Sequence, residues 1–263
     1  MQNKLKAFFE KENIEFFRSF KIDQNIKLKY ARKLPEWSAG GVVFLIPYKV
    51  ESCGRNVSEY AVPRDYHFYI KEFSQRLENE FYGTDLKMQV FSDNSPFFER
   101  DIAQTSGLGF FGKNHLLINE KYGSFIFVGE VVLDFVPDIS GGDSCEKNTC
   151  LDCGACVSAC PGKCLLGDDF SECLSGLTQQ KNLTETQKTE VSKHNLVWGC
   201  DICQEVCPHN KNVKETPIEF FKKERLPFVD KNLLREMSDE EFLRRAYSWR
   251  GRDVILRNLD LHE

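Results

Sequence analysis

The first half of the chain alternates short apolar runs with longer amphipathic segments. Residues 39–47, AGGVVFLIP, are apolar, rich in β-branched side chains and bounded by glycine and proline, which predicts a buried strand. Residues 65–82 predict a helix, because apolar side chains recur there at every fourth position: Tyr69, Phe73, Leu77 and Phe81. A mixture of helices and strands in one segment indicates an α/β or α+β sheet domain.

Three further signals follow in the same half. Residues 87–91, KMQVF, predict another strand. Ser95 is expected to cap a helix that has Pro96 at its first position. Residues 115–118 and 124–134 flank the turn-rich sequence NEKYG, and we expect them to pair as a β-hairpin that ends this domain.

Composition divides the chain into three predicted domains. Residues 1–140 carry the mixed helix and strand pattern, whereas residues 141–210 are rich in cysteine, glycine and proline. Residues 211–263 are basic and helical in pattern. There, Ser238 and Glu241 have the spacing of a capping box at the start of a helix.

The overall composition excludes several classes of protein. A chain of 263 residues with 41% hydrophobic and 29% charged residues is not mainly disordered. A net charge of −5 argues against binding nucleic acid by bulk charge alone. No apolar run approaches the roughly 20 residues of a membrane helix, and the N-terminus has no signal-peptide core. We therefore expect a cytoplasmic protein without a membrane partner, in which clustered cysteines are metal ligands.

Most of the 11 cysteines belong to two related motifs. Residues 150–161, CLDCGACVSACP, have the C-x₂-C-x₂-C-x₃-C-P spacing of bacterial two-cluster ferredoxins. Residues 200–208, CDICQEVCP, match the tail of a second such motif, but Val197 stands where its leading cysteine is expected. An upstream cysteine, either Cys164 or Cys173, is needed to complete the second set.

The motif predicts crossed ligation of two 4Fe–4S clusters, since its fourth cysteine binds the other cluster. The first cluster is expected at Cys150, Cys153, Cys156 and Cys207. The second is expected at Cys160, Cys200, Cys203 and one distant cysteine. For that ligand we favour Cys173, because Cys164 lies only four residues after Cys160. The cysteines then left over as spare thiols are Cys53, Cys145 and Cys164.

A pair of zinc sites is the alternative, since C-x₂-C pairs also suit tetrahedral zinc. The repeated closure of the motifs by Cys-Pro favours iron–sulfur clusters. Two such clusters form a path for electrons, so the redox chemistry is expected in the domain of residues 1–140.

Motifs in that domain point to its chemistry. In chain order they are YAVPRDYH from Tyr60, DNSPFFER from Asp93, GLGFFGKN from Gly107 and the pair Gly129-Glu130. After them come Cys173-Leu-Ser and WGCDICQEVCP from Trp198. This order and spacing, from about Tyr60 to Asn258, resemble the epoxyqueuosine reductase family, whose members are cobalamin-dependent iron–sulfur enzymes that complete queuosine in tRNA.

The resemblance implies a fold and a reaction. The fold is an α/β (α+β) cobalamin-binding domain fused to a two-cluster ferredoxin-like module with a short helical C-terminus. The reaction is reduction of epoxyqueuosine to queuosine in the tRNA anticodon loop by base-off cobalamin, fed by the two 4Fe–4S clusters. An external low-potential donor such as a flavodoxin or ferredoxin would supply the electrons. We expect a monomer, and a short member of the family without its C-terminal HEAT-like repeats.

The resemblance also assigns roles to residues. Asp93 matches the family's proton donor and is the expected catalytic residue; the alternative is that Asp93 caps the helix expected near Pro96. The residues expected near the cofactor, besides Asp93, are Arg64, Tyr66, His67, Lys113, Leu117, Val128 and Gln180. His67 is not expected to bind cobalt, since position 70 is Ile rather than the Gly of a D-x-H-x-x-G corrinoid motif. For Lys113, contact with a corrin amide or a tRNA phosphate stands against a solvated lysine in a tight turn.

Basic residues with interleaved aromatics mark residues 244–257. Tyr247 and Trp249 lie among them, a pattern that suits phosphate contact and base stacking. A solvated helix face is the alternative interpretation. The residues predicted to bind tRNA are Arg244, Arg245, Arg250 and Arg252.

Two other functions compete with this prediction. One is a corrinoid and iron–sulfur reductase that acts on a small organic substrate. The other is a noncatalytic iron–sulfur protein that only transfers electrons. Bound corrinoid separates the second from the first, and dependence of queuosine formation on the protein separates the first from the main prediction.

Overall fold

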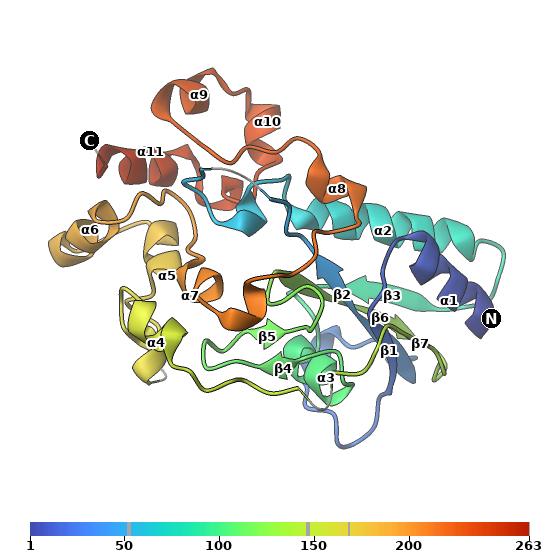
Figure 1. Cartoon of the computed structure of the whole chain (residues 1–263). Helices are drawn as coiled ribbons and strands as arrows, with labels where there is room; N and C mark the ends of the chain where they lie inside the picture. Colours follow the sequence, from blue (N-terminus) through green and yellow to red (C-terminus); the bar gives the residue numbers. More distant parts are fainter. Residues whose placement is uncertain (52–53, 146–147, 168, 263) are drawn as a thin grey trace. The chain divides into compact units, whose positions relative to one another are not determined.

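The computed structural model describes residues 1–262 except 52–53, 146–147 and 168, so the predicted spare thiol Cys53 lies outside the described residues. The chain forms two compact units (Figure 1). The first comprises residues 1–47, 67–111 and 117–150, and the second comprises residues 48–66, 112–116 and 151–263. This division is discontinuous, whereas composition predicted three consecutive domains with boundaries at 140 and 210. No described helix combines the length and apolar character needed to cross a bilayer.

The first unit is built on a five-stranded antiparallel sheet of order β3-β6-β2-β1-β7 (Figure 1). A separate ribbon pairs β4 with β5. The predicted strands at 39–47 and 87–91 are confirmed as β2 and β3. The strands are β1 (Phe17–Lys21), β2 (Gly40–Pro47), β3 (Met88–Phe91), β4 (Phe110–Phe111), β5 (Leu117–Ile118), β6 (Ile126–Leu133) and β7 (Ser140–Gly141).

One face of the sheet is covered by two helices, α1 (Gln2–Lys11) and α2 (Tyr66–Glu80), the second of which confirms the predicted helix. Phe9 of α1 stacks on Phe17 with ring centroids 4.9 Å apart, and Phe73 of α2 stacks on Phe44 at 5.0 Å. Such aromatic pairs add directional contacts to a large buried apolar area.

The opposite face packs against α3 (Glu99–Thr105), with Val43 and Leu45 of β2 in one cluster with Ile102. Strand β2 is therefore buried on both faces, which explains why its sequence shows no polar alternation. The predicted helix start at Pro96 is wrong, because α3 begins at Glu99 with Phe98 as its N-cap.

The predicted hairpin of residues 115–118 and 124–134 is also wrong. Strand β5 pairs with β4, whereas β6 lies between β2 and β3 in the main sheet. The side chain of Asn119 organises the connection, since its Nδ2 donates to the Leu108 carbonyl at 2.9 Å and its Oδ1 accepts from the Lys121 amide at 3.0 Å. Apart from Glu130, strand β6 is apolar on both sides, which favours a central place in the sheet over a two-stranded hairpin.

The second unit is mostly helical. Trp198 and Tyr247 are fully buried at its centre, where their rings meet edge to face with centroids 6.1 Å apart. The capping box of Ser238 and Glu241 is confirmed at the start of α10. The helices are α4 (Ala155–Ala159), α5 (Leu174–Gln179), α6 (Glu185–Ser192), α7 (Ile202–Glu205), α8 (Glu219–Lys222), α9 (Lys231–Glu236), α10 (Asp239–Leu243) and α11 (Arg252–Asp260). The short 3₁₀ turns of the two units are η1 (Ala31–Lys33), η2 (Glu59–Ala61), η3 (Cys164–Leu166), η4 (Pro208–Asn210) and η5 (Ser248–Arg250).

Replacing Gly129 by Ala is expected to destabilise the first unit. A Cβ at Gly129 would lie 2.4 Å from Cζ of the buried Phe44 ring, so the packed core must shift. Overpacking of this kind lowers the free energy of unfolding by about 1–3 kcal/mol. Gly176→Ala in α5 is the control, since a Cβ there meets nothing within 4 Å. Urea denaturation should show a loss for Gly129→Ala and none for Gly176→Ala; equal stability of both variants would contradict the packing described.

Candidate functional site

Four predicted cluster ligands come together in the second unit. Cys160 ends α4, Cys173 directly precedes α5, and Cys200 and Cys203 flank the start of α7. The pKa of Cys200 and of Cys203 is raised to about 12, mainly by burial, with contributions from the charges of Cys160 and Cys173. These four sulfurs are thus close enough to influence one another's ionisation.

Cys164 lies near two members of this group, Cys160 and Cys173. Burial raises the pKa of Cys164 to about 11, and the charged neighbours that add to the shift are Cys160 and Cys173. Its Sγ lies 3.5 Å from the Gly162 carbonyl oxygen. Cys173 contributes to the raised pKa of Cys164, Cys200 and Cys203, so both candidate ligands lie near this group and the choice of Cys173 stays a prediction.

A buried carboxylate holds the turn that carries Cys200 and Cys203. Asp201 is 2% exposed, and its oxygens accept hydrogen bonds from Ser58 Oγ and the Glu59 amide, both at 2.6 Å, and from Gln204 Nε2 at 2.9 Å. The Arg55 guanidinium lies 3.2 Å from Asp201 Oδ2. Residues 55–59 are therefore fastened to the cysteine segment within the second unit.

The other four predicted ligands differ in exposure. Cys156 and Cys207 are buried, Cys153 is exposed, and Cys150 is half-buried as the last residue of the first unit. Helices α4 and α7, whose ends carry these motifs, lie beside each other (Figure 1). Among the described residues, no three Cys, His, Asp or Glu side chains converge closely enough to hold a single metal ion. The donors present are thiols in the spacing that suits 4Fe–4S clusters.

Asp93 lies on a tight turn directly after β3, in the first unit. Its backbone has φ = 57°, in the left-handed region that few residues other than Gly adopt, and its side chain is exposed. The Asp93 amide donates to Glu99 Oε2 at 2.9 Å, which fixes the turn against the start of α3. The N-cap of α3 is Phe98, so Asp93 does not cap this helix.

Two glutamates, Glu99 and Glu130, are connected to this turn by hydrogen bonds from Asp93 and Ser95. Burial raises the pKa of Glu99 to about 7, with a contribution from the charge of Asp93 and opposition from Lys29. Burial also raises the pKa of Glu130 to about 8; the Ser95 hydrogen bond opposes this shift, and the Glu99 charge adds to it. Glu130 was noted in the sequence only as part of a family motif. The sequence feature that could have identified Glu130 is that it is the single acidic residue in the otherwise apolar strand IFVGEVVL.

Ser95 connects the turn to the sheet. Its Oγ donates to Glu130 Oε2 and accepts from the Phe97 amide at 3.0 Å. This bond to a strand far along the chain replaces the helix-capping role that the sequence predicted for Ser95.

The RDYH segment is divided between the two units, with Arg64 and Tyr66 in the second and His67 in the first. The Arg64 guanidinium lies 4.4 Å from the centroid of the Phe220 ring, and its Nε is 3.5 Å from Glu224 Oε1. Tyr66 is buried and His67 is exposed.

Residues of the GLGFFGKN segment serve local packing. A Cβ at Gly109 would lie 2.6 Å from the Ile118 carbonyl, so this glycine permits the close approach of β5. Lys113 Nζ pairs with Asp152 Oδ1 of the first cysteine motif at 2.6 Å, and both side chains remain largely exposed. Asn114 is 5% exposed, and its Nδ2 has no hydrogen-bond partner among the described residues.

The three remaining predicted cofactor residues lie in different surroundings. Leu117 and Val128 are buried in the core of the first unit, where the Val128 carbonyl accepts from Ser92 Oγ at 2.8 Å. Gln180 lies in the second unit, where its carbonyl accepts from Arg257 Nη1 at 2.6 Å. Leu117 and Val128 thus share one core, to which Gln180 does not belong.

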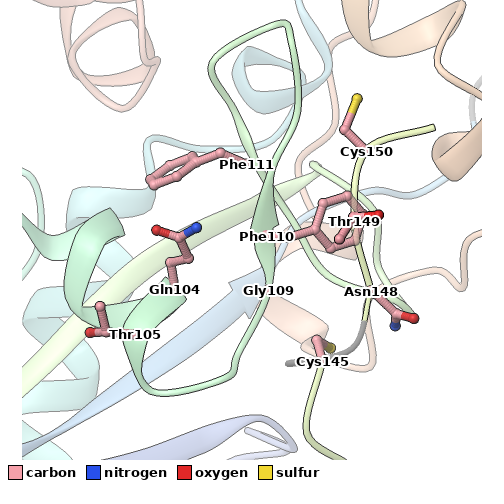
Figure 2. Close-up of a pocket in the computed structure, with 9 residues that line it drawn as sticks. All are labelled: Gln104, Thr105, Gly109, Phe110, Phe111, Cys145, Asn148, Thr149 and Cys150. Carbon is pink, nitrogen blue, oxygen red and sulfur yellow. The ribbon is translucent and has the colours of Figure 1, made fainter. Parts of the chain in front are cut away.

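A pocket of about 480 Å³ lies in the first unit. Figure 2 shows the end of α3 on one side of β4, and Cys145 with the residues leading to Cys150 on the other. The spare thiol Cys145 is buried there, with Asn119 Nδ2 3.7 Å from its Sγ. The pocket is lined by Gln104, Thr105, Gly109, Phe110, Phe111, Cys145, Asn148, Thr149 and Cys150.

The arginines predicted to bind tRNA divide into two kinds. Arg252 donates to the carbonyls of Leu234 and Met237, at 2.6 and 2.8 Å, so it closes the end of α9. Arg244 donates to the Glu240 carboxylate, and Arg245 donates to the backbone carbonyl of Glu224.

The remaining arginine, Arg250, stacks over the Trp249 ring at 3.8 Å from its centroid, and Trp249 is 61% exposed. Exposed aromatic rings of this kind are what bases stack on in nucleic-acid-binding proteins.

Comparisons with known proteins agree with these features. Residues 149–210 match the family model of a 4Fe-4S double cluster binding domain. An epoxyqueuosine reductase from Cyclobacterium marinum is 39% identical over 195 residues, which cover 71% of this chain and 60% of that protein. One from Leadbetterella byssophila is 32% identical, over 74% of this chain and 67% of that protein. The chain thus spans about 60% of the length of the first of these relatives.

Solved structures agree in fold. The structure of epoxyqueuosine reductase from Streptococcus thermophilus superposes with a TM-score of 0.78 at 22% identity, covering 100% of this chain and 81% of that one. A crystal structure of epoxyqueuosine reductase with an epoxyqueuosine-modified tRNA stem loop also has a TM-score of 0.78, at 23% identity, covering 99% and 80%. The common fold is α/β with a 4Fe–4S binding domain. With curated relatives above 30% identity along most of its length, this chain belongs to the epoxyqueuosine reductase family.

Proposed function

We propose that this chain reduces epoxyqueuosine to queuosine in the anticodon loop of tRNA, using cobalamin and two 4Fe–4S clusters. The observation that carries the proposal is that one chain of this family combines the cluster-binding segment 149–210 with an exposed carboxyl, Asp93, held on a fixed turn. The net reaction consumes two electrons and two protons, and it releases the epoxide oxygen as water.

The thiols are suited to hold the clusters. Cys160, Cys173, Cys200 and Cys203 form the second set and Cys150, Cys153, Cys156 and Cys207 the first. Bound clusters supply one-electron transfer from an external low-potential donor such as a flavodoxin or ferredoxin. Asp201 keeps the Cys200–Cys203 turn in place whether or not iron is bound, because its partners are all protein groups.

The chain also offers a group that fits cobalamin. Asn114 Nδ2 is a buried donor without an acceptor among the described residues, and the amide side chains of cobalamin carry carbonyl acceptors. Bound and reduced cobalamin supplies a strongly nucleophilic cobalt for opening the epoxide. Arg64, Tyr66, His67, Lys113, Leu117, Val128 and Gln180 remain proposed neighbours of this cofactor.

Asp93 is the proposed proton donor to the epoxide oxygen. Its carboxyl is exposed to solvent, its backbone amide is bonded to Glu99, and the neighbouring turn is bonded to the chain before β2. There the Lys29 amide donates to the Pro96 carbonyl at 2.8 Å, and Leu28 bridges to Phe97. A rigid turn of this kind holds an acid in a reactive position at low entropic cost.

Asp93→Asn is expected to leave both clusters and cobalamin in place and to lower turnover by about 100-fold or more, since the variant cannot donate a carboxyl proton. The measurement is anaerobic conversion of epoxyqueuosine-containing tRNA, alongside visible and EPR spectra of the loaded protein. Asp101→Asn, an exposed aspartate of α3, is the control. Full activity of Asp93→Asn would remove Asp93 from the mechanism. Loaded wild type that leaves this tRNA unchanged would contradict the proposed substrate.

Cys173→Ala is expected to remove one cluster and keep the other, so the iron content of reconstituted protein falls from about eight to about four per chain. Cys164→Ala is the matched comparison, because Cys164 lies in the same group of sulfurs. It is expected to retain both clusters. The opposite result for the two variants would identify Cys164 as the ligand.

Trp249→Ala is expected to weaken binding of the tRNA anticodon stem–loop by about tenfold, since an exposed aromatic ring contributes roughly 1–3 kcal/mol per stacked base. Phe228→Ala is the control, because Phe228 is another exposed aromatic residue of the same unit, at 50% exposure. Fluorescence anisotropy with a labelled stem–loop measures both. Equal affinity of the two variants would place the tRNA-binding surface elsewhere.

A further inference from the structure

Three carboxyl groups follow one another from the surface into the core of the first unit. Asp93 is exposed, Glu99 is half-buried at the first position of α3, and Glu130 is fully buried in the middle of β6. In the sheet, Glu130 pairs in register with Val43 of β2 and Phe91 of β3, so both neighbouring positions are apolar. A carboxyl in such surroundings is costly to ionise.

Adjacent members of this row interact. The Asp93 amide donates to Glu99 Oε2 at 2.9 Å, and a hydrogen bond also joins the two side chains. The charge of Glu99 also raises the pKa of Glu130. Glu130 Oε2 accepts from Ser95 Oγ, whereas Glu130 Oε1 is buried with no hydrogen-bond partner among the described residues.

Positive charge is scarce around the two glutamates. Lys29 is the cation that lowers the pKa of Glu99, and no lysine, arginine or histidine of the described part of the chain forms an ion pair with Glu130. Strands β2 and β3, which flank Glu130, contain no charged residue. Helix α3 contributes Glu99, Arg100 and Asp101. Without a nearby compensating charge, Glu130 remains protonated near neutral pH.

The proposed reaction makes a particular demand on this region. Each turnover needs two protons at the same oxygen, whereas a single carboxyl carries one. Asp93 must therefore regain a proton while the substrate is still bound, and the neighbouring carboxyls are a source that needs no exchange with solvent.

We propose that Glu99 and Glu130 form a proton-supply row behind Asp93, which restores the proton that Asp93 gives to the substrate. Both are positioning residues that act through Asp93. The inference rests on the proposed function, which sets the demand for two protons.

The transfers balance within the row. Asp93 gives its proton to the epoxide oxygen as the C–O bond opens, and the resulting Asp93 carboxylate takes a proton from Glu99. Glu99 is in turn restored from Glu130 or from solvent. Asp93 then protonates the hydroxyl group that leaves as water. Two protons have left the row, two electrons have entered the substrate from the donor, and solvent restores the row after product release.

A purely structural role is the competing explanation, since Glu130 also anchors Ser95 and Glu99 anchors the Asp93 amide. Glutamine separates the two roles. In Glu99→Gln and Glu130→Gln the side-chain carbonyl still accepts the same hydrogen bond, but neither side chain can release a carboxyl proton.

The first experiment measures multiple-turnover rates of the loaded enzyme across pH. In wild type, the rate is expected to fall as pH rises above about 7–8, because Glu99 and Glu130 then lose the protons they must supply. Glu130→Gln should lower the rate by about tenfold or more and remove the part of this fall that belongs to Glu130. A small carboxylic acid in the buffer should restore part of the rate. Asp101→Asn should follow wild type. Unchanged rates and pH profiles for both glutamine variants would overturn the proposal.

The second experiment needs neither cofactor nor substrate. The pKa of Glu130 is raised in the folded protein, so protonated Glu130 favours folding at low pH and this contribution is lost as pH rises through about 8. Glutamine does not titrate. The difference in Tm between Glu130→Gln and wild type should therefore shift in favour of the variant as pH increases from about 5 to about 9. A difference that stays constant with pH would show that Glu130 stores no proton, which would overturn the row.

The two experiments separate failure of the row from failure of the proposed function. A protein that shows the shift in Tm but no turnover of epoxyqueuosine in wild type refutes the substrate, not the protonated glutamate. A protein that turns over normally with Glu130→Gln at every pH refutes the row and leaves the proposed function standing.

Discussion

Burial of both faces of β2 and β6 is the constraint on which the first unit depends. Helices α1 and α2 cover one face and α3 the other, so almost every side chain in the central strands must be apolar. Glu130 is the exception in β6, and its position is possible only for a carboxyl that is neutral or well bonded. Ser95 supplies one bond and thereby draws the Asp93 turn onto the sheet. The position of Asp93, the proposed acid, thus follows from the hydrogen bond that the buried Glu130 makes with Ser95.

The second unit depends in the same way on one buried carboxylate. Asp201 accepts hydrogen bonds from Ser58, Glu59 and Gln204, and it lies beside Arg55, so both of its carboxyl oxygens have partners. Ser58 and Glu59 precede Asp201 by 143 and 142 residues, and their bonds to it connect residues 48–66 to the rest of the unit. The same bonds hold the Cys200–Cys203 turn before any iron is present, so the thiols need less ordering on binding.

Local patterns in the sequence correctly predicted those features that depend on contacts between residues close together in the chain. The cysteine spacing, the α2 periodicity and the capping box of α10 all lie within a few residues of their partners. The failures share a different cause. Ser95 is a good helix cap by local rules, but its actual partner is Glu130, 35 residues later. Arg252 shows the same limit of local patterns, since its guanidinium also bonds the carbonyls at the end of α9, and its role in tRNA binding stays a prediction. No residue next to Ser95 or Arg252 in the sequence indicates which groups they contact.

Desolvation controls the ionisation of both the cluster-binding thiols and the carboxyl groups of the proposed proton supply. Burial keeps the thiols of Cys200 and Cys203 neutral until a cationic partner is available, and burial keeps Glu130 neutral until a base stands next to it. A negative charge that enters a covered, poorly solvated site raises the proton affinity of the groups around it. Protons stored close to Asp93 would therefore move as electrons arrive, and net charge would not accumulate beside the substrate. In such a site, storing protons in neutral carboxyls is less costly than storing compensating cations, because a neutral acid carries a much smaller desolvation penalty than an ion.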